Sequence, residues 1–192
     1  IVAEQQSGPC GWDVMGAQPE PGQLRLWTYQ ALAHGAEGIL YFRFRALPYG
    51  MEQYWYGVLD HDGVPRRRYY ELQRTGRELE KLTPYIVGKH SRYEALIVRT
   101  YDNVWGHEIK SHVKGFDYRS LLYEYYRANA RLNIPTAVSV GNYEDYRAVY
   151  MPAYNIVHRG ELEAVAEYVK EGGTLVVTFR SGGRDPENNL FT

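Results

Sequence analysis

Short apolar runs alternate with amphipathic segments along most of this chain, and this alternation limits the fold more than any other feature of the sequence. The apolar runs that have the length of strands are 1–6, 38–44, 95–98, 136–140, 148–151 and 174–179. The segments with apolar residues at helical spacing are 22–34, 67–82, 117–132 and 161–170. Alternating strands and helices form parallel sheets covered by helices. The sequence therefore predicts an α/β fold.

A polar stretch around 88–92 separates two such patterns and is predicted to be a linker. Residues 1–87 hold two strand–helix units, too few to close a sheet or bury both of its faces. Residues 93–192 restart the alternation and predict a separate flavodoxin-like domain. The chain begins with Ile1 inside a predicted strand and ends in the polar segment 185–192, so we expect further residues on both sides.

Charge and composition narrow the classes of partner. The formal net charge is -1, which gives no basic surface for nucleic acid or for an anionic membrane. No run of 18 apolar residues is present, so no membrane span is predicted. The single cysteine, Cys10, excludes an internal disulfide and fits a reducing, cytoplasmic location. Aromatic residues make up 15% of the chain, which slightly favours a carbohydrate ligand.

Motifs for metals, nucleotides and serine nucleophiles are missing from the sequence. His107 and His112 are five residues apart and no cysteine accompanies them. The segment 60–63 ends in Asp-Gly, a turn signature. The glycine pairs lack the spacing of phosphate-binding loops, and Ser181 has no nearby His or acid in the sequence. We therefore expect no metal and no cofactor.

A carboxylate at the end of the first predicted strand is the leading catalytic candidate. Glu4 lies beside two glutamines and precedes a loop rich in Gly and Pro. In a (β/α)₈ barrel, the carboxyl ends of strands carry side chains into the active site, where Glu4 would suit a nucleophile. The alternative is a Glu that faces solvent or caps the loop. Trp12, in that loop, is either a stacking platform for a sugar or a hydrophobic anchor.

Polar and aromatic residues also follow the second predicted strand. Alternation places Arg43 and Arg45 on one face, where they either pair with carboxylates in a barrel mouth or form a structural ion pair, the interpretation that we favour. Glu52 and Trp55 follow in the next loop. A carboxylate beside an indole suits a sugar, through hydrogen bonds and stacking. The alternative is a loop packed by its own aromatic residues.

Taken together, these segments resemble glycoside hydrolase family 42, the β-galactosidases. The residues that carry the resemblance are Ala3-Glu4-Gln5-Gln6-x-Gly8-Pro9-x-x-Trp12, Pro21-Gly22-x-x-Arg25-Leu26-Trp27-Thr28, Ala33-His34-Gly35-Ala36, Tyr41-Phe42-Arg43-Phe44-Arg45, Glu52-Gln53 and Gly57-x-Leu59-Asp60-His61-Asp62-Gly63. The second half resembles the family's trimerisation domain. The resemblance implies the C-terminal βα units of a (β/α)₈ TIM barrel followed by a flavodoxin-like three-layer domain.

The resemblance also implies roles for individual residues. Glu4 would be the nucleophile at the end of barrel strand 7, and Trp12 would line the galactose subsite. Glu52 would bind sugar hydroxyls from the loop after strand 8. Many members of the family have His three residues after that Glu, where this chain has Trp55. This difference points to a variant specificity, for example towards plant cell-wall oligosaccharides.

The family's acid/base Glu lies at the end of barrel strand 4, which this sequence does not contain. A retaining mechanism needs two carboxyl groups roughly 5–5.5 Å apart, so the chain alone is expected to be inactive. The resemblance implies a homotrimer as the assembly and a galactoside as the substrate. One alternative is an oligomerisation module without catalytic activity. Another, a small-molecule domain of flavodoxin or amidotransferase type, lacks its phosphate loop or nucleophile elbow.

Overall fold

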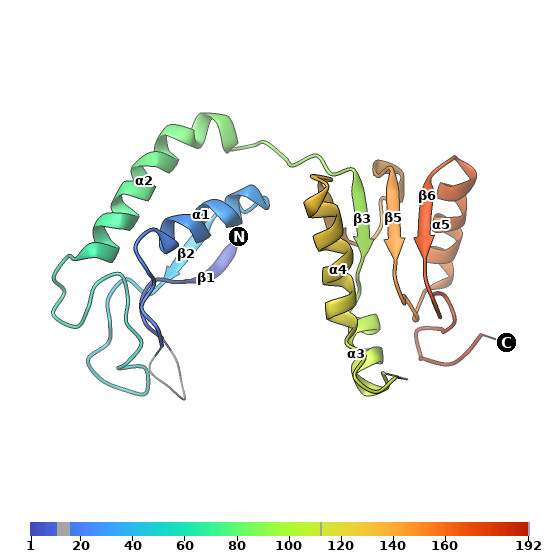
Figure 1. Cartoon of the computed structure of the whole chain (residues 1–192), viewed down its shortest axis with the longest axis horizontal. Helices are drawn as coiled ribbons and strands as arrows, with labels where there is room; N and C mark the ends of the chain where they lie inside the picture. The colour runs from blue at the N-terminus through green and yellow to red at the C-terminus, as the bar shows by residue number, and fades with distance from the viewer. Residues whose placement is uncertain (11–15, 112, 192) are drawn as a thin grey trace. The chain divides into compact units, whose positions relative to one another are not determined.

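The computed structural model describes residues 1–10, 16–111 and 113–191. The chain divides into two compact units, Ile1–Ser91 and Arg92–Thr192, which we call the first and the second unit. Figure 1 shows that each unit contains both strands and helices, and that the strands drawn in the second unit are parallel. None of the described helices is long and apolar enough to cross a membrane.

The first unit contains two strand–helix pairs in chain order. Its elements are β1 (Val2–Gln6), α1 (Gln23–Ala33), β2 (Ile39–Phe42) and α2 (Arg67–Ile86). The two strands pair in parallel, as expected for strands joined by a crossover helix. Helix α1 ends before Gly35, whose φ of 86° is a left-handed conformation that glycine adopts without strain.

The two strands of the first unit have a helix-covered face and an open face. Gln5 pairs with Tyr41, and Gln6 with Phe42. The Tyr41 hydroxyl lies 2.5 Å from Thr28 Oγ1 of α1, so the face of Gln5 and Tyr41 is the one that α1 covers. Because side chains alternate along a strand, Gln6 and Phe42 point to the other, open face. Leu40, two residues before Phe42, is 58% exposed there.

Helix α2 extends further than its sequence predicts. Pro84 was expected to end the helix, but the helix continues to Ile86 with Pro84 inside it. A proline lacks the N–H that would bond to the carbonyl four residues earlier. At Pro84 this loss falls in the last turn, where the backbone still bonds from Val87 N to Thr83 O at 3.0 Å. The helix therefore tolerates the proline near its end.

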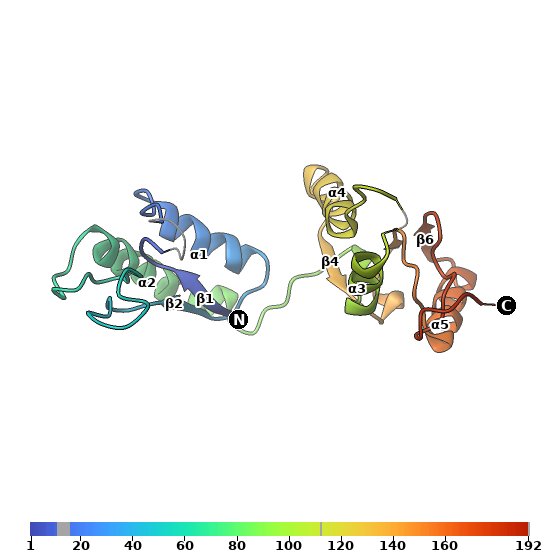
Figure 2. The ribbon, with the colours of Figure 1, turned by 90° about the horizontal axis from the view of Figure 1, so that it is seen from below.

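The second unit is a four-stranded parallel sheet with helices on both faces. Its elements are β3 (Ala95–Val98), α3 (Tyr101–Ile109), α4 (Tyr118–Arg131), β4 (Thr136–Ser139), the 3₁₀ turn η1 (Tyr143–Asp145), β5 (Ala148–Met151), α5 (Arg159–Lys170) and β6 (Thr174–Val177). The strand order is β4-β3-β5-β6. Figure 1 shows β3, β5 and β6 running in the same direction, and Figure 2 shows β4 next to α4. Every pairing is parallel, which confirms the predicted α/β architecture.

Strand β3 shows why the second unit has three layers. All four of its residues are buried, so both of its faces are covered. Leu96 and Val98 point to one side, where they pack with Val165 and Tyr168 of α5. Ile97 points to the other side and packs with side chains of α3 and α4. Alternation along one strand thus divides the core into two clusters, one on each side of the sheet.

Helix α3 has no counterpart among the helices predicted from the sequence. Its inward face carries polar residues, Asn103 and His107, and Gly106 lies in its middle. The buried face therefore lacks an apolar repeat, although an N-cap is present, because the Thr100 side chain accepts a hydrogen bond from Asn103 N. Tertiary contacts rather than an apolar stripe fix this helix in place.

Candidate active-site region

The backbone of β1 is irregular at the predicted nucleophile. Val2 pairs with Ile39 and Gln5 with Tyr41, so three steps along β1 match two steps along β2. This extra residue is a β-bulge, a device that redirects side chains and is frequent beside active sites. Both residues inside the bulge, Ala3 and Glu4, are exposed. Val2 and Gln5 pair with Ile39 and Tyr41, so the bulged residues Ala3 and Glu4 lie opposite Leu40, which is on the open face of the strand pair.

The segment after β1 is held tightly to the segment after β2. Ser7 is fully buried, and its Oγ donates to Phe42 O at 2.9 Å and to Arg43 O at 3.1 Å. A Cβ atom on Gly8 would lie 2.6 Å from Tyr56 O, and one on Gly57 would clash with Arg43 O. Two glycines thus allow the backbones to approach closely at the carboxyl ends of both strands.

Glu52 forms an ion pair with the first residue after β2. Arg43 Nη2 lies 2.6 Å from Glu52 Oε2, and the two side chains are 17% and 35% exposed. The guanidinium also stacks over the Phe42 ring, 4.6 Å from its centroid. Arg43 Nη1 is buried and has no hydrogen-bond partner. Arg43 therefore forms an ion pair, and its partner is the carboxylate that was expected to bind sugar.

Trp55 packs against the open face of β2. Its ring meets the Phe42 ring edge-on, with centroids 5.9 Å apart and planes at 86°. Trp55 N donates to Glu52 O at 3.0 Å, so one short turn presents both the carboxylate and the indole. Because Phe42 shares the open face with Gln6 and Leu40, the indole lies at the carboxyl end of the face that carries Glu4. The indole thus packs on an aromatic residue of the strand, and Trp55 is half-buried.

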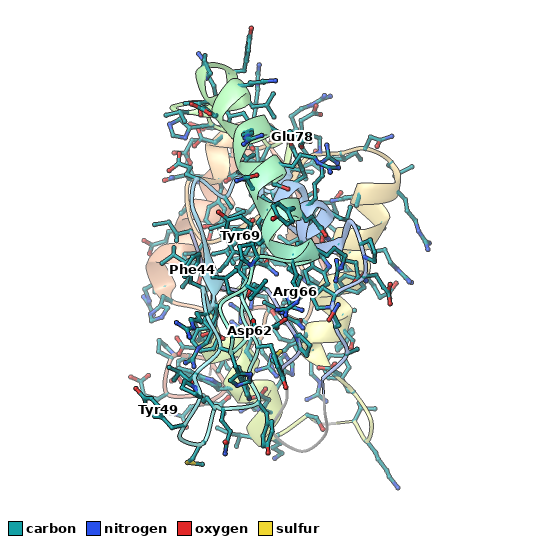
Figure 3. The ribbon with its side chains drawn as sticks, turned by 90° about the vertical axis from the view of Figure 1, so that its left-hand side faces the viewer. Phe44, Tyr49, Asp62, Arg66, Tyr69 and Glu78 are labelled. Atoms are coloured by element: carbon teal, nitrogen blue, oxygen red, sulfur yellow. The ribbon has the colours of Figure 1, made fainter. Side chains whose placement is uncertain are left out.

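A network of ion pairs fixes the rest of the loop after β2. Asp60 to Gly63 form the expected turn, with Gly63 N donating to Asp60 O at 3.0 Å. Arg68, which is buried, donates to Gly57 O at 3.0 Å and pairs with Asp60. Arg66 pairs with Asp62 at 2.6 Å, as Figure 3 shows, and its hydrogen bonds hold the pKa of Asp62 well below the usual range.

Arg45 takes part in this loop and not in the Glu52 pair. Its Nη2 donates to His61 O at 3.0 Å, and the ring of His61 in turn lies 2.6 Å from Gln53 O through Nε2. The two arginines that leave β2 therefore have different roles. Arg43 holds the carboxylate of Glu52, whereas Arg45 holds the turn at its other end.

The four predicted site residues differ in how the structure places them. Glu52 and Trp55 belong to one short turn, and Glu4 lies on the open face of β1. Within the described ranges, Glu4 makes no hydrogen bond and no ion pair. Trp12 lies outside the described residues, so its role in lining a sugar subsite stays a prediction. Among residues 1–10, 16–111 and 113–191, no three His, Cys, Asp or Glu side chains form a group that could hold a metal ion.

The sequence did not single out Ser7 or Arg68. Both contact backbone carbonyls of the loop that carries Glu52, and both are buried polar side chains. The signal for Ser7 is its place between the predicted nucleophile strand and Gly8. For Arg68 no local signal distinguishes it from its neighbours Arg66 and Arg67, because only the fold selects which of the three points inward.

Two family models match the chain. The model described as "Beta-galactosidase" matches residues 1–82, and the one described as "Beta-galactosidase trimerisation domain" matches residues 94–192. The second match alone covers more than half of the chain. The gap between the two matches contains the polar stretch that joins the two units.

Curated relatives give the same result. The chain is 32% identical over 191 residues to a β-galactosidase of Halorubrum lacusprofundi, covering 98% of this chain and 27% of the relative. It is 34% identical over 185 residues to a β-galactosidase of Thermus thermophilus, covering 95% of this chain and 28% of the relative. The chain thus spans little more than a quarter of the length of these relatives.

Solved structures confirm the fold class. The β-galactosidase of Bacillus circulans sp. alkalophilus matches with a TM-score of 0.93 and 31% identity, over 100% of this chain and 29% of that one. The Halorubrum lacusprofundi β-galactosidase matches with a TM-score of 0.88 and 33% identity, over 98% and 28%. The parallel sheets are those of βα units of a TIM barrel and of the domain that follows it. The chain therefore belongs to glycoside hydrolase family 42, the β-galactosidases.

Proposed function

We propose that this chain supplies the nucleophile of a retaining β-galactosidase and that Glu4 is this nucleophile. In this proposal β1 and β2 are strands 7 and 8 of the barrel. The position of Glu4 carries the proposal: an exposed carboxylate at a bulge, on the open face of a parallel strand pair, close to its carboxyl end. Carboxyl ends of barrel strands are where catalytic side chains lie.

The chemistry follows from a carboxylate that has no competing partner among the described residues. An oxygen of Glu4 attacks the anomeric carbon, and the bond from that carbon to the leaving oxygen breaks. A second carboxyl group, from a part of the barrel outside this chain, gives its proton to the leaving oxygen. The same group then takes a proton from water, which attacks the anomeric carbon and releases Glu4. Because this chain lacks the second group, we expect it to be inactive alone.

Glu52 and Trp55 support a sugar substrate in this proposal. A carboxylate has about four acceptor positions, so the pairing of Arg43 with Glu52 Oε2 leaves capacity for sugar hydroxyls. Arg43 and Trp55 each contact Phe42, which limits the freedom of the turn before a ligand arrives. A terminal β-D-galactoside is the proposed substrate. Trp55, where many relatives carry His, favours a plant cell-wall oligosaccharide as the natural source of that sugar.

Labelling with a 2-fluoro-galactoside tests the nucleophile in the full-length protein that contains this chain. The fluorine slows hydrolysis of the glycosyl-enzyme, so peptide mass spectrometry should find the sugar on Glu4. Glu4→Gln should abolish labelling and lower kcat by a factor of 10³ or more, about 4 kcal/mol. Glu37→Gln is the matched control, because Glu37 is exposed and precedes β2 at its opposite end. A label on a different carboxylate would disprove the assignment.

We also propose that the second unit holds copies of the chain in a homotrimer. The match of residues 94–192 to a trimerisation domain supports this proposal. A module that only assembles, without catalysis, is the alternative for the chain as it stands. Light scattering after size-exclusion chromatography should give three times the chain mass of 22.3 kDa. A monomer at every concentration would disprove the homotrimer. It would not affect the assignment of Glu4 as nucleophile, which the labelling experiment tests independently.

A further inference from the structure

Helix α3 is fixed to the second unit by its inward face. Asn103 is fully buried, and its amide bonds both backbone groups of Ile156: Nδ2 donates to the carbonyl at 2.7 Å, and Oδ1 accepts from the N–H at 2.9 Å. His107 Nε2 lies 2.8 Å from Ala153 O. At Gly106 a Cβ atom would lie 2.8 Å from Ile156 Cδ1, so the helix packs as closely as a glycine allows.

The outward face of the same helix is apolar and exposed. Tyr101, Trp105 and Ile109 recur every four residues and are 59%, 53% and 80% exposed. The rings of Tyr101 and Trp105 lie 5.4 Å apart, tilted by 33°. The Arg99 guanidinium stacks over Tyr101, 4.5 Å from the ring centroid. We call these four residues the α3 stripe. Its aromatic members are already in contact, so little freedom remains to be lost on binding.

We propose that the α3 stripe binds a second copy of this chain and anchors the interface between copies. This inference rests on the proposed homotrimer and identifies the surface that forms it. Trp, Tyr and Arg are the residues that dominate the centres of protein interfaces. The stripe presents one of each: Tyr101, Trp105 and Ile109 lie on a helix that its inward contacts hold rigid, and Arg99 stacks on Tyr101 from the segment before it.

The size of the stripe fits the centre of an interface. A buried aromatic side chain covers about 150–250 Å², so two half-exposed rings and Ile109 offer on the order of 300 Å². This is comparable to the largest apolar patch of a typical monomer. A stable interface buries about 800 Å² on each partner, with a polar rim around an apolar centre. The stripe therefore supplies the apolar centre, and the surrounding surface supplies the rim.

Closed trimers join different surfaces of neighbouring copies. The stripe of one copy therefore contacts a surface outside its own stripe on the next copy. A single substitution in the stripe then disrupts all contacts of the ring, because each contact contains one stripe. This geometry makes assembly more sensitive to one residue than a contact with several independent anchors would be.

Trp105→Glu tests the proposal, with Tyr123→Glu as the matched control on α4, because Tyr123 is 59% exposed, close to the 53% of Trp105. The wild-type chain and Tyr123→Glu should show the trimer mass by light scattering. Trp105→Glu should shift to the monomer, with assembly at least tenfold weaker. Far-UV circular dichroism checks that each variant is folded, and Ile109→Lys replaces Trp105→Glu if that variant unfolds.

Each result separates the two proposals. A trimeric Trp105→Glu overturns the stripe while the homotrimer stands, as does equal dissociation by Tyr123→Glu, which would reflect added charge alone. A monomeric wild-type chain overturns the homotrimer itself. Loss of the trimer in Trp105→Glu with the control unaffected supports the α3 stripe as the contact.

Discussion

The two parallel sheets of this chain differ in what covers their strands. In the second unit, the four residues of β3 are at most 1% exposed, with a strand on each side and helices on both faces. In the first unit, β1 pairs only with β2 among the described strands, and Leu40 is 58% exposed. One sheet is a closed core, whereas the other has a helix-covered face and an open one.

This difference separates stability from chemistry. Of the buried apolar side chains in the described residues, the first unit contributes only Pro19, Leu24, Ala46, Val58 and Leu59. Its polar contacts instead fix the loops that carry Glu52 and Trp55. The second unit contains most of the buried apolar residues and none of the predicted site residues. The contrast suggests that hydrophobic burial stabilises the second unit, while close backbone contacts order the first.

The largest expected effect tests the closed core directly. Leu96→Ala removes a fully buried side chain from β3 and should cost about 2–5 kcal/mol. The matched variant Leu40→Ala removes an exposed side chain from β2 and should change stability by less than about 0.5 kcal/mol. Hydrogen exchange of the strand amides measures both changes locally. A large loss of stability in Leu40→Ala would show that the open face is covered in this chain, and the contrast between the two sheets would then be wrong.

A pair of glycine variants tests whether close backbone contacts order the first unit. Gly57→Ala would place a Cβ atom against Arg43 O and should cost about 1–3 kcal/mol, because backbone must move. Gly76→Ala lies in α2 with open space around it and should stabilise the helix by about 0.5–1 kcal/mol. Thermal unfolding of the two variants checks the opposite signs. Equal changes in melting temperature for the two variants would contradict the importance of the close contact between Gly57 and the Arg43 backbone.

The smallest effect concerns the buried tyrosines of the second unit. Burial raises the pKa of Tyr154 above its usual value of 10.0, and its hydrogen bond to Glu161 raises it further; Tyr143 behaves alike. Below pH 10 both tyrosines are protonated in the folded and in the unfolded state, so their contribution to the free energy of unfolding is fully present. Above pH 10 the unfolded state loses protons first, so stability falls by about 1.4 kcal/mol per pH unit for each tyrosine.

Urea unfolding between pH 9 and 11 measures this slope. Tyr154→Phe should lower the pH dependence of the free energy of unfolding by the contribution of one tyrosine. Tyr49→Phe should leave this dependence unchanged, because Tyr49 is 71% exposed. An unchanged slope in Tyr154→Phe would show that this hydroxyl ionises as easily in the folded state as in the unfolded state.

Much of the fold could be predicted from the sequence, for physical reasons that particular elements show. The run Ala95–Val98 is apolar throughout, which requires burial on both faces, and β3 is buried in this way. Helix α3 could not be predicted, since two of its three buried residues, Asn103 and His107, are polar and bond to backbone groups that are distant in sequence. The extension of α2 past Pro84 depends on where in the helix the proline falls, which the sequence alone left open.

The site could be predicted only in part. Glu4 was expected at a strand end, and the structure adds the bulge and the open face, which depend on the register with β2. Glu52 and Trp55 were expected together in one loop, and they share a turn. The choice of Arg43 and not Arg45 as the partner of Glu52 depends on the path of that loop. No local pattern encodes this path.

The amide of Asn103 links the interior of the second unit to the proposed contact between copies. It satisfies both the N–H and the carbonyl of Ile156, so it needs a donor and an acceptor at fixed places. Aspartate has the same shape but offers only acceptors, and one of them would face a carbonyl. A single nucleotide change that turns this amide into an acid would therefore loosen the helix beneath Trp105. If the α3 stripe joins the copies as proposed, this change would separate them through a residue that is buried inside one copy.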